Sequence, residues 1–186
     1  MLITLPTIIH ADPIRSRYPI IDWEIHHDRL GKSWKITRVG GQFAIFKNFE
    51  NLVRACDRAD LEELWNLVQI RLDTNSSSDA KEQELWVEFN RMFDPEPKDV
   101  HWKFPYYDPS TTWEFLSLSS IHHLYTQSGI ELFMLAEKEY PLSYEVLKTM
   151  ISKRLRCDKD DENSEIVQSL LRSIFEQSER KRKDRK

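Results

Sequence analysis

Residues that cross-link or interrupt a chain are scarce in this sequence. Its 186 residues include four Gly, eight Pro and two Cys. Cys56 and Cys157 alone cannot form a disulfide framework or a four-cysteine zinc site, and no cofactor is predicted. No apolar run reaches the 18 residues typical of a membrane-spanning helix, and residues 1–9 lack the basic leader of a signal peptide. We therefore expect an intracellular, reduced protein, with no preference between nucleus and cytoplasm.

Aromatic and charged residues are abundant by contrast. Six Trp, six Tyr and nine Phe occur in a chain that is 40% hydrophobic and 31% charged, which is typical of a folded domain. The net charge is −4; residues 180–186 contribute +5 from six basic residues and one Asp, which leaves −9 for residues 1–179. An acidic body repels a phosphate backbone. In the simpler interpretation, the tail is a disordered, solvated extension. In the alternative interpretation, it contacts nucleic acid through Arg180, Lys181, Arg182, Lys183, Arg185 and Lys186.

The first half of the chain follows a strand pattern and then a helix pattern. Alternating residues 20–26 predict a strand, residues 33–39 a second, and Gly40-Gly41 a hairpin turn into a third at 42–46. Asn48 is a candidate cap for a short helix, and Asp60 with Glu63 resembles a capping box that opens another. Three apolar stripes are expected to face inward: Phe49, Leu52, Val53 and Cys56; Leu61, Leu64, Trp65, Val68 and Leu72; and Leu85, Trp86, Phe89, Met92 and Phe93.

A loop and a connection separate these helices from a second group of strands and helices in the same order. Residues 73–79 form a loop, DPEP at 94–97 ends the third helix, and residues 98–110 form an aromatic connection. Strands are predicted at 112–118, 120–126 and 130–137, the last of them central because it is apolar on both faces. Helices follow from 143 to about 156 and on to about 179.

These elements predict an α+β fold, in which two three-stranded groups form small antiparallel sheets packed against about five helices. The repeated order suggests an internal duplication, although a common supersecondary order arises equally well by coincidence. We expect a single domain over 18–179, with possible halves 18–94 and 98–179. Residues 1–17 form a leader of uncertain order, and residues 180–186 form the basic tail.

Two groups of residues invite a metal-site hypothesis. Asp22, Glu24 and His26 share one strand face and are suitable metal ligands for a hydrolase, but a solvated face of a half-buried strand explains the same alternation. The pairs His26-His27 and His122-His123 offer only one ligand each to a common site, because neighbours on a strand point to opposite faces. Histidines at the surface or at the core edge are the favoured interpretation.

Two further groups have similarly simple explanations. Cys56 lies on an apolar helix stripe and is interpreted as a small buried residue rather than a nucleophile. Trp23, Trp34, Lys32, Lys35 and Arg38 are suited to stacking single-stranded bases. Since Trp34 lies opposite Lys35 in the alternation, the tryptophans are expected to face the core instead. No hydrolase, P-loop or aspartic protease signature is present, and no catalytic residue is predicted.

An ordered set of short motifs carries a resemblance to a known segment. The motifs are Tyr18–Glu24 (YPIIDWE), Trp34–Gly40 (WKITRVG), Asp60-Leu61 with Leu64–Val68 (LWNLV), Glu84–Glu88 (ELWVE), Ile121–Leu124 (IHHL) and Met134–Ser143 (MLAEKEYPLS). Together they resemble an uncharacterised segment that recurs in plant retrotransposon-derived polyproteins, alongside gag and copia-type pol regions. The resemblance covers about residues 18–179 and implies no catalytic residues. The zinc-knuckle, protease, integrase and reverse-transcriptase motifs of such polyproteins are absent.

Three functions remain open at this level. The first is a non-enzymatic protein-interaction or self-assembly module of retrotransposon origin, which binds through helix faces or aromatic edges. The alternative is a nucleic-acid-binding accessory domain that uses the basic tail and aromatic side chains. A metal-assisted hydrolase built on Asp22, Glu24 and His26 is the third, and an element remnant without a function is compatible with the same residues. No membrane partner is expected.

Overall fold

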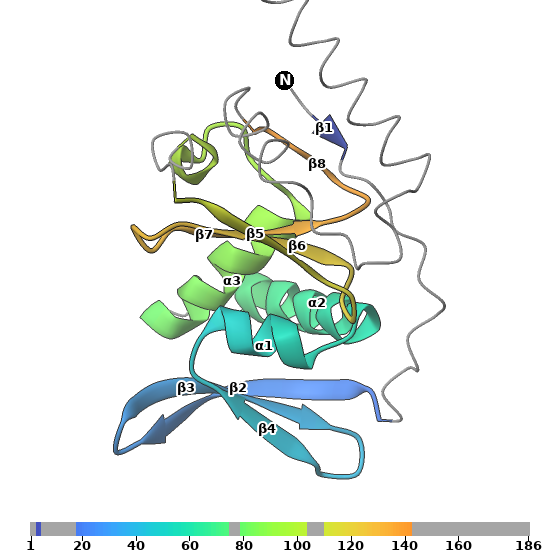
Figure 1. The fold of residues 1–186 in the computed structure, drawn as a ribbon. Helices are drawn as coiled ribbons and strands as arrows, with labels where there is room; N and C mark the ends of the chain where they lie inside the picture. The colour runs from blue at the N-terminus through green and yellow to red at the C-terminus, as the bar shows by residue number, and fades with distance from the viewer. Residues whose placement is uncertain (1–2, 5–17, 75–78, 104–109, 143–186) are drawn as a thin grey trace, which may run out of the picture. The chain divides into compact units, whose positions relative to one another are not determined.

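The computed structural model describes residues 3–4, 18–74, 79–103 and 110–142 (Figure 1). The chain divides into two compact units, the N-terminal unit (Ile9–Asp94 with Leu116–Ser120) and the C-terminal unit (Met1–Ile8, Pro95–Phe115 and Ile121–Lys186). The described residues contain two separate three-stranded sheets and three α-helices, so the fold is of the α+β type. Within these ranges, no helix is long and apolar enough to cross a membrane. The two helices predicted over 143–179 lie outside the described residues.

The sheet of the N-terminal unit forms where the alternating patterns predict it. It consists of β2 (Ile20–Asp28), β3 (Gly31–Arg38) and β4 (Phe43–Phe46), antiparallel and in the order β2-β3-β4. Trp23 pairs with Ile36, and Trp34 pairs with Phe46. Because opposite residues share a face, these apolar side chains gather on one side of the sheet, where Figure 1 shows the helices of the unit.

The first helix begins at its predicted cap and the second does not. In α1 (Phe49–Ala55) the Asn48 side chain accepts from the Asn51 N–H at 2.9 Å. The capping box predicted at Asp60 and Glu63 is wrong, because α2 (Arg58–Thr74) starts three residues before Leu61. Asp57 accepts from the Asp60 N–H at 2.9 Å, and Asp60 accepts from the Asp57 N–H at 3.4 Å, so these two aspartates form the reciprocal cap.

The third helix, α3 (Ala80–Phe93), is capped by Asp79 and ends directly before the DPEP segment at 94–97, as predicted. Leu85, Phe89 and Met92 are buried along one stripe, as predicted. The inward placement of Trp86 is wrong: 37% of this residue is exposed. Trp86 follows Leu85 directly and is therefore rotated about 100° from the stripe, which turns even a large apolar side chain toward solvent.

Two cations cover the buried tryptophans of the sheet. The Arg71 guanidinium of α2 lies 4.3 Å from the Trp23 ring centroid, and Lys81 Nζ of α3 lies 3.9 Å from that of Trp34. Trp34 Nε1 also donates to the Lys81 carbonyl at 3.0 Å. Each pair is a cation–π contact that fixes a helix on the sheet. The prediction that both tryptophans face the core is confirmed, since at most 1% of either residue is exposed.

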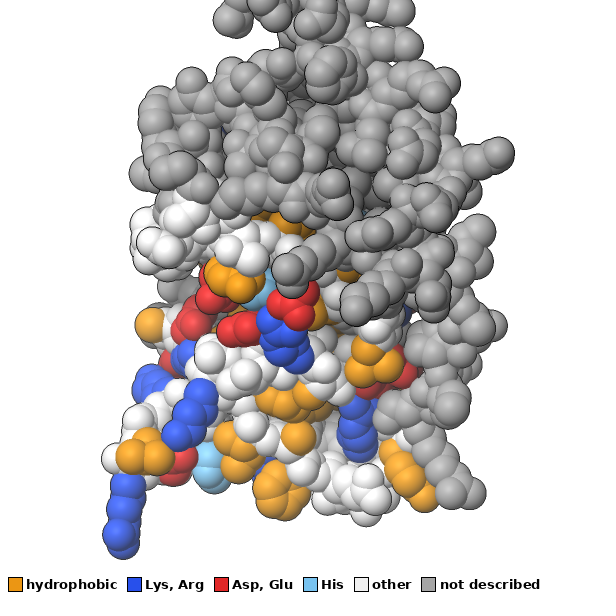
Figure 2. All heavy atoms as spheres, viewed as in Figure 1, with side chains coloured by type: hydrophobic (Ala, Val, Ile, Leu, Met, Phe, Trp, Pro, Cys, Tyr) orange, Lys and Arg blue, Asp and Glu red, His pale blue; other side chains and the backbone are white. Residues whose placement is uncertain are grey.

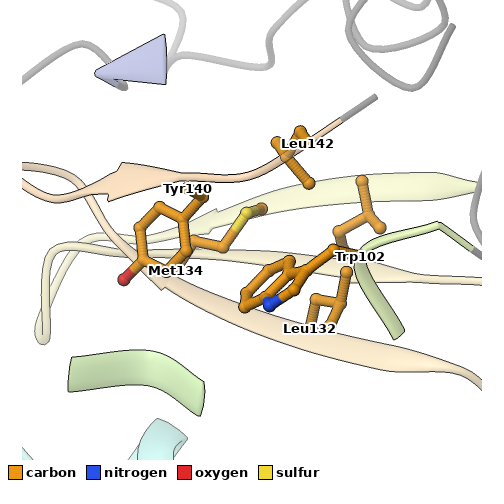
Figure 3. Close-up of a cluster of buried hydrophobic side chains, with 6 residues drawn as sticks. Trp102, Leu132, Met134, Tyr140 and Leu142 are labelled. Carbon is orange, nitrogen blue, oxygen red and sulfur yellow. The ribbon is translucent and has the colours of Figure 1, made fainter. Parts of the chain in front are cut away.

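The C-terminal unit has its own sheet and core. Its strands are β5 (Thr112–Leu116), β6 (Ile121–Tyr125) and β7 (Glu131–Leu135), in the order β5-β6-β7. The 3-10 helix η1 (Val100–Trp102) and the two-residue strands β1 (Ile3–Thr4) and β8 (Glu139–Tyr140), which pair with each other, complete it. Figure 3 shows the buried cluster, whose members are Trp102, Leu124, Leu132, Met134, Tyr140 and Leu142.

Two predictions about this sheet are wrong. The apolar strand within 130–137 is β7, and it lies at the edge of the described sheet, whereas β6 is central. His122 and His123 of β6 are only 2% and 1% exposed, so they are core residues rather than surface or core-edge ones. His122 Nδ1 accepts from Trp113 Nε1 at 3.0 Å, and the His123 ring stacks on Phe133 at 4.3 Å. Aromatic neighbours on both faces of the central strand therefore replace solvent around the imidazoles.

Candidate interaction surface

The free edge of β4 is the most distinctive exposed feature of the N-terminal unit. β4 pairs with β3 on one side, and no described strand pairs with its other side (Figure 1). Its sequence is Phe43-Ala44-Ile45-Phe46, without a charge, a proline or a bulge. Phe43 is 61% exposed and Ile45 is 40% exposed. An uncovered apolar strand of this kind is a template for pairing with another chain.

The hairpin turn decides which backbone groups face this edge. Gly40 and Gly41 have φ angles of +90° and +79°, a left-handed conformation that glycine adopts without strain. The Arg38 N–H donates to the Gln42 carbonyl at 2.8 Å, so these two residues form a hydrogen-bonded pair of the ladder. Pairs alternate along an antiparallel ladder. Ala44 and Phe46 therefore direct their backbone groups toward β3, while Phe43 and Ile45 direct theirs toward the free edge.

Charges on the outer face of the sheet are neutralised close to this edge. Lys35, opposite Ile45, forms an ion pair with Glu24 and lies 5.2 Å from the Phe43 ring centroid. The hydrogen bond from Lys35 lowers the pKa of Glu24. Figure 2 shows the result over the sheet, where hydrophobic side chains lie among single basic and acidic ones. The outer surface over Phe43 and Ile45 is thus apolar, and the charges beneath it, Lys35 and Glu24, neutralise each other.

The opposite edge of the same sheet, β2, is protected. Five of its nine residues carry a carboxylate or an imidazole: Asp22, Glu24, His26, His27 and Asp28. The register also shifts between Ile20 and Asp22. Charges and bulges are the devices by which edge strands avoid pairing with other chains. One sheet therefore presents a protected edge and an unprotected one.

The two acids of the Asp22, Glu24 and His26 set on β2 are each paired with a basic neighbour. Asp22 accepts from Arg71 Nη2 at 2.8 Å, and Glu24 binds Lys35. The described residues contain no group of three or more His, Cys, Asp or Glu side chains arranged to hold a metal ion. Asp22 and Glu24 are exposed and ion-paired, which is typical of a solvated strand face.

The residues considered for base stacking do not lie together on an open surface. Trp23 and Trp34 are buried beneath Arg71 and Lys81. Lys32 forms an ion pair with Asp79 at 2.6 Å and Lys35 one with Glu24, so both are partly neutralised. The basic tail, residues 180–186, lies outside the described residues.

Arg38 belongs to a buried ion pair rather than to a binding surface. Its two terminal nitrogens each donate to one oxygen of Asp60, both at 2.6 Å, and Nη1 also donates to the Tyr18 carbonyl at 3.0 Å. Asp60 is only 4% exposed, and its hydrogen bonds raise the pKa of Arg38. The pair joins the end of β3 to the start of α2.

Cys56 is confirmed as a buried residue, since it is 1% exposed. Burial raises the pKa of its thiol to about 12, and the nearby Asp60 carboxylate adds to this effect. Below pH 9 the thiol therefore stays protonated in the folded protein. The thiolate, which is the nucleophilic form, is suppressed at neutral pH.

Cys56 gives a pH-dependent prediction. In a Cys157→Ser background, the folded protein is expected to resist iodoacetamide at pH 8 and to react once unfolded. The unfolded thiol loses its proton near pH 9 and the folded one near pH 12, so stability falls as the pH rises through this window, by up to about 4 kcal/mol. Urea denaturation between pH 8 and 11 measures the first part of this loss, about 2.6 kcal/mol by pH 11. Cys56→Ala in the same background is the control, and an equal loss in both proteins would contradict the assignment.

No family model, curated protein or solved structure matches the chain. Its function is therefore inferred from the residues and geometry of the two units.

Phe43 and Ile45 were not among the residues singled out by their sequence pattern. Residues 42–46 are apolar on both faces, which is equally typical of a buried strand and of an uncovered edge. The lack of any charge between Gln42 and Lys47 is the signal that distinguishes this strand from β2.

Proposed function

We propose that the chain is a non-enzymatic protein-interaction module that accepts an extended strand at the free edge of β4. The observation that carries this proposal is the contrast between the two edges of one sheet, β2 with its charges and bulge, and β4 with Phe43 and Ile45 exposed. Added strands gain affinity from main-chain hydrogen bonds and specificity from alternate side chains. An origin in a retrotransposon polyprotein belongs to the same proposal and rests on the residue motifs alone.

Both components of such recognition are available at β4. Phe43 and Ile45 direct their backbone groups toward the edge, which provides the donors and acceptors of a new ladder. Their side chains lie on the exposed outer face, beside the neutralised Lys35–Glu24 pair. A partner strand with apolar residues at alternate positions complements this surface.

The test compares the wild type with Ile45→Pro. Displayed eight-residue peptides are selected on the full chain and then measured on both proteins. Proline at 45 removes a donor that faces the edge and spares the ladder with β3. We expect peptides with alternating apolar residues to bind the wild type and to lose binding on the variant. Failure to select any such peptide, or binding that survives Ile45→Pro, would overturn the proposal.

A proline one residue earlier is the matched control. The N–H of Ala44 faces β3, so Ala44→Pro breaks an internal hydrogen bond and is expected to cost about 1–3 kcal/mol of stability. Ile45→Pro is expected to cost less. Urea denaturation of both variants checks the alternation. If Ile45→Pro were the more damaging, Ile45 would be bonded to β3 and the assignment of the edge groups would be wrong.

The nucleic-acid alternative depends on the tail and is tested separately. Removing residues 180–186 takes away six basic residues. If the tail supplies phosphate contacts, the truncated chain should lose most of its affinity for single-stranded RNA and most of the salt dependence of binding. Fluorescence anisotropy at two salt concentrations measures both. Undiminished binding after truncation would exclude this mechanism.

A further inference from the structure

We infer that the occupant of the β4 edge is a second copy of this chain, paired antiparallel about Ala44, so that two three-stranded sheets join into one of six strands. The inference rests on the proposed function, because it names the partner of the same edge. A two-fold axis perpendicular to a sheet relates its two halves in such a pairing, and each copy contributes the same surface. The free edge of β4 meets the requirements of this symmetry at three levels.

The first level is the backbone. Two-fold pairing along the length of β4 centres on Ala44 or on Ile45, because directly opposite residues must lie on the same face. With Ala44 at the centre, Phe43 of each copy lies opposite Ile45 of the other. These are the residues whose backbone groups face the edge, so both pairs exchange both of their hydrogen bonds.

The second level is the side chains. On the outer face, each Phe43 meets an Ile45 of the second copy, an aromatic and β-branched pair that stabilises antiparallel strands. On the inner face, Ala44 meets Ala44 of the second copy across the two-fold axis. A methyl group on each side leaves space for the strands to approach, and Phe46 lies opposite Gln42 of the second copy.

The third level is charge, which decides between the two registers. Pairing about Ile45 places Lys47 of the second copy against Phe43, where Lys35 already lies 5.2 Å from the ring centroid. Two ammonium groups would then share one ring, and like charges side by side destabilise a sheet. Pairing about Ala44 sets the two Lys35 residues three strand spacings apart and offset by two residues along the strands, roughly 16 Å in all, which is more than a Debye length. Each Lys35 is also neutralised by Glu24.

The size of the contact sets the expected affinity. Two four-residue strands bury less surface than the roughly 1,200 Å² of a stable interface. The dimer is therefore expected to be weak, reversible and dependent on concentration. Sedimentation equilibrium over a wide concentration range should show a monomer–dimer equilibrium of the full chain. Ile45→Pro should weaken it by about tenfold or more, because two hydrogen bonds of about 1 kcal/mol each are lost.

Cysteine cross-linking tests the register on the full chain. In a Cys157→Ser background, with the buried Cys56 left in place, Ala44→Cys is compared with Ile45→Cys under mild oxidation at high concentration. In the Ala44 register, the thiols introduced by Ala44→Cys are directly opposite each other. In the same register the two Ile45 residues are not opposite each other, and the distance between their Cα atoms exceeds the roughly 7 Å that a disulfide allows. The thiols introduced by Ile45→Cys therefore cannot be joined. We expect a covalent dimer from Ala44→Cys alone.

The other outcomes count against the inference in distinguishable ways. Cross-linking of Ile45→Cys alone would overturn the register. A chain that stays monomeric at high concentration, or a dimer insensitive to Ile45→Pro, would overturn self-pairing. None of these results contradicts the proposed function, which is supported if selected peptides bind the wild type but not the Ile45→Pro variant. Loss of both self-pairing and peptide binding would remove both.

Discussion

Replacing Asp60 with alanine is expected to cost about 3 kcal/mol of folding free energy. Asp60 is 4% exposed and receives both terminal nitrogens of Arg38 at 2.6 Å. The substitution leaves the Arg38 guanidinium without its counter-ion and removes half of the reciprocal cap with Asp57. We place the loss at the lower end of the range for buried pairs because 20% of the Arg38 side chain reaches solvent. Urea denaturation followed by far-UV circular dichroism measures it.

An exposed ion pair of the same unit provides the control. Glu50 and Arg54 lie one turn apart on α1, 2.9 Å from each other, and a third of each side chain is exposed. Glu50→Gln is expected to cost only about 0.3–0.5 kcal/mol, as is usual for such helix pairs. If Asp60→Ala cost no more than Glu50→Gln, the Arg38–Asp60 pair would not be what joins β3 to α2.

The position of the capping box shows what spacing cannot decide. Asp57 with Asp60 and Asp60 with Glu63 have the same three-residue separation, so both fit the pattern of a helix start. The choice depends on contacts distant in sequence. Arg38 donates to the carboxylate of Asp60. The Ile20 N–H donates to the carboxylate of Glu63 at 3.1 Å, so the acid that the pattern assigns to the cap binds a strand residue instead.

Elements with a local cause could be predicted well. Alternation predicts β2 and β3, Gly40-Gly41 predicts the turn before β4, and Asn48 predicts the start of α1. Each of these depends on residues within a few positions of one another. Strand order does not, because it depends on which strands pair and which edge stays open. For this reason the sequence pattern does not predict that β6, rather than β7, is the central strand, or that the histidines of β6 are buried.

The candidate surface could not be predicted for the same reason. A short apolar strand is expected in a core when its neighbours are unknown. Phe43 and Ile45 are placed at an edge only by the strand order, in which β3 is the one described strand that pairs with β4. The sequence does contain the complementary information, since β2 concentrates acids and imidazoles. Comparing the charge content of the first and third strands of a predicted meander is therefore a usable indicator of an edge suited to pairing.

Replacing Trp102 with alanine is expected to cost about 3–5 kcal/mol, the largest effect of any substitution considered. Trp102 is fully buried in the C-terminal unit, and its ring centroid lies 5.3 Å from that of Tyr140. Figure 3 shows its indole among Leu132, Met134 and Leu142. Alanine leaves a cavity that these side chains only partly fill. Urea denaturation of the full chain measures the loss.

Two variants separate packing from other effects of the substitution. Val100→Ala, in the same 3-10 helix and 55% exposed, should change stability by less than about 0.5 kcal/mol. Trp102→Phe should cost much less than Trp102→Ala, because a phenyl ring keeps most of the aromatic volume. It also removes the buried indole N–H, which has no hydrogen-bond partner among the described residues. Equal losses for Phe and Ala would contradict the argument that the aromatic volume at position 102 stabilises this core.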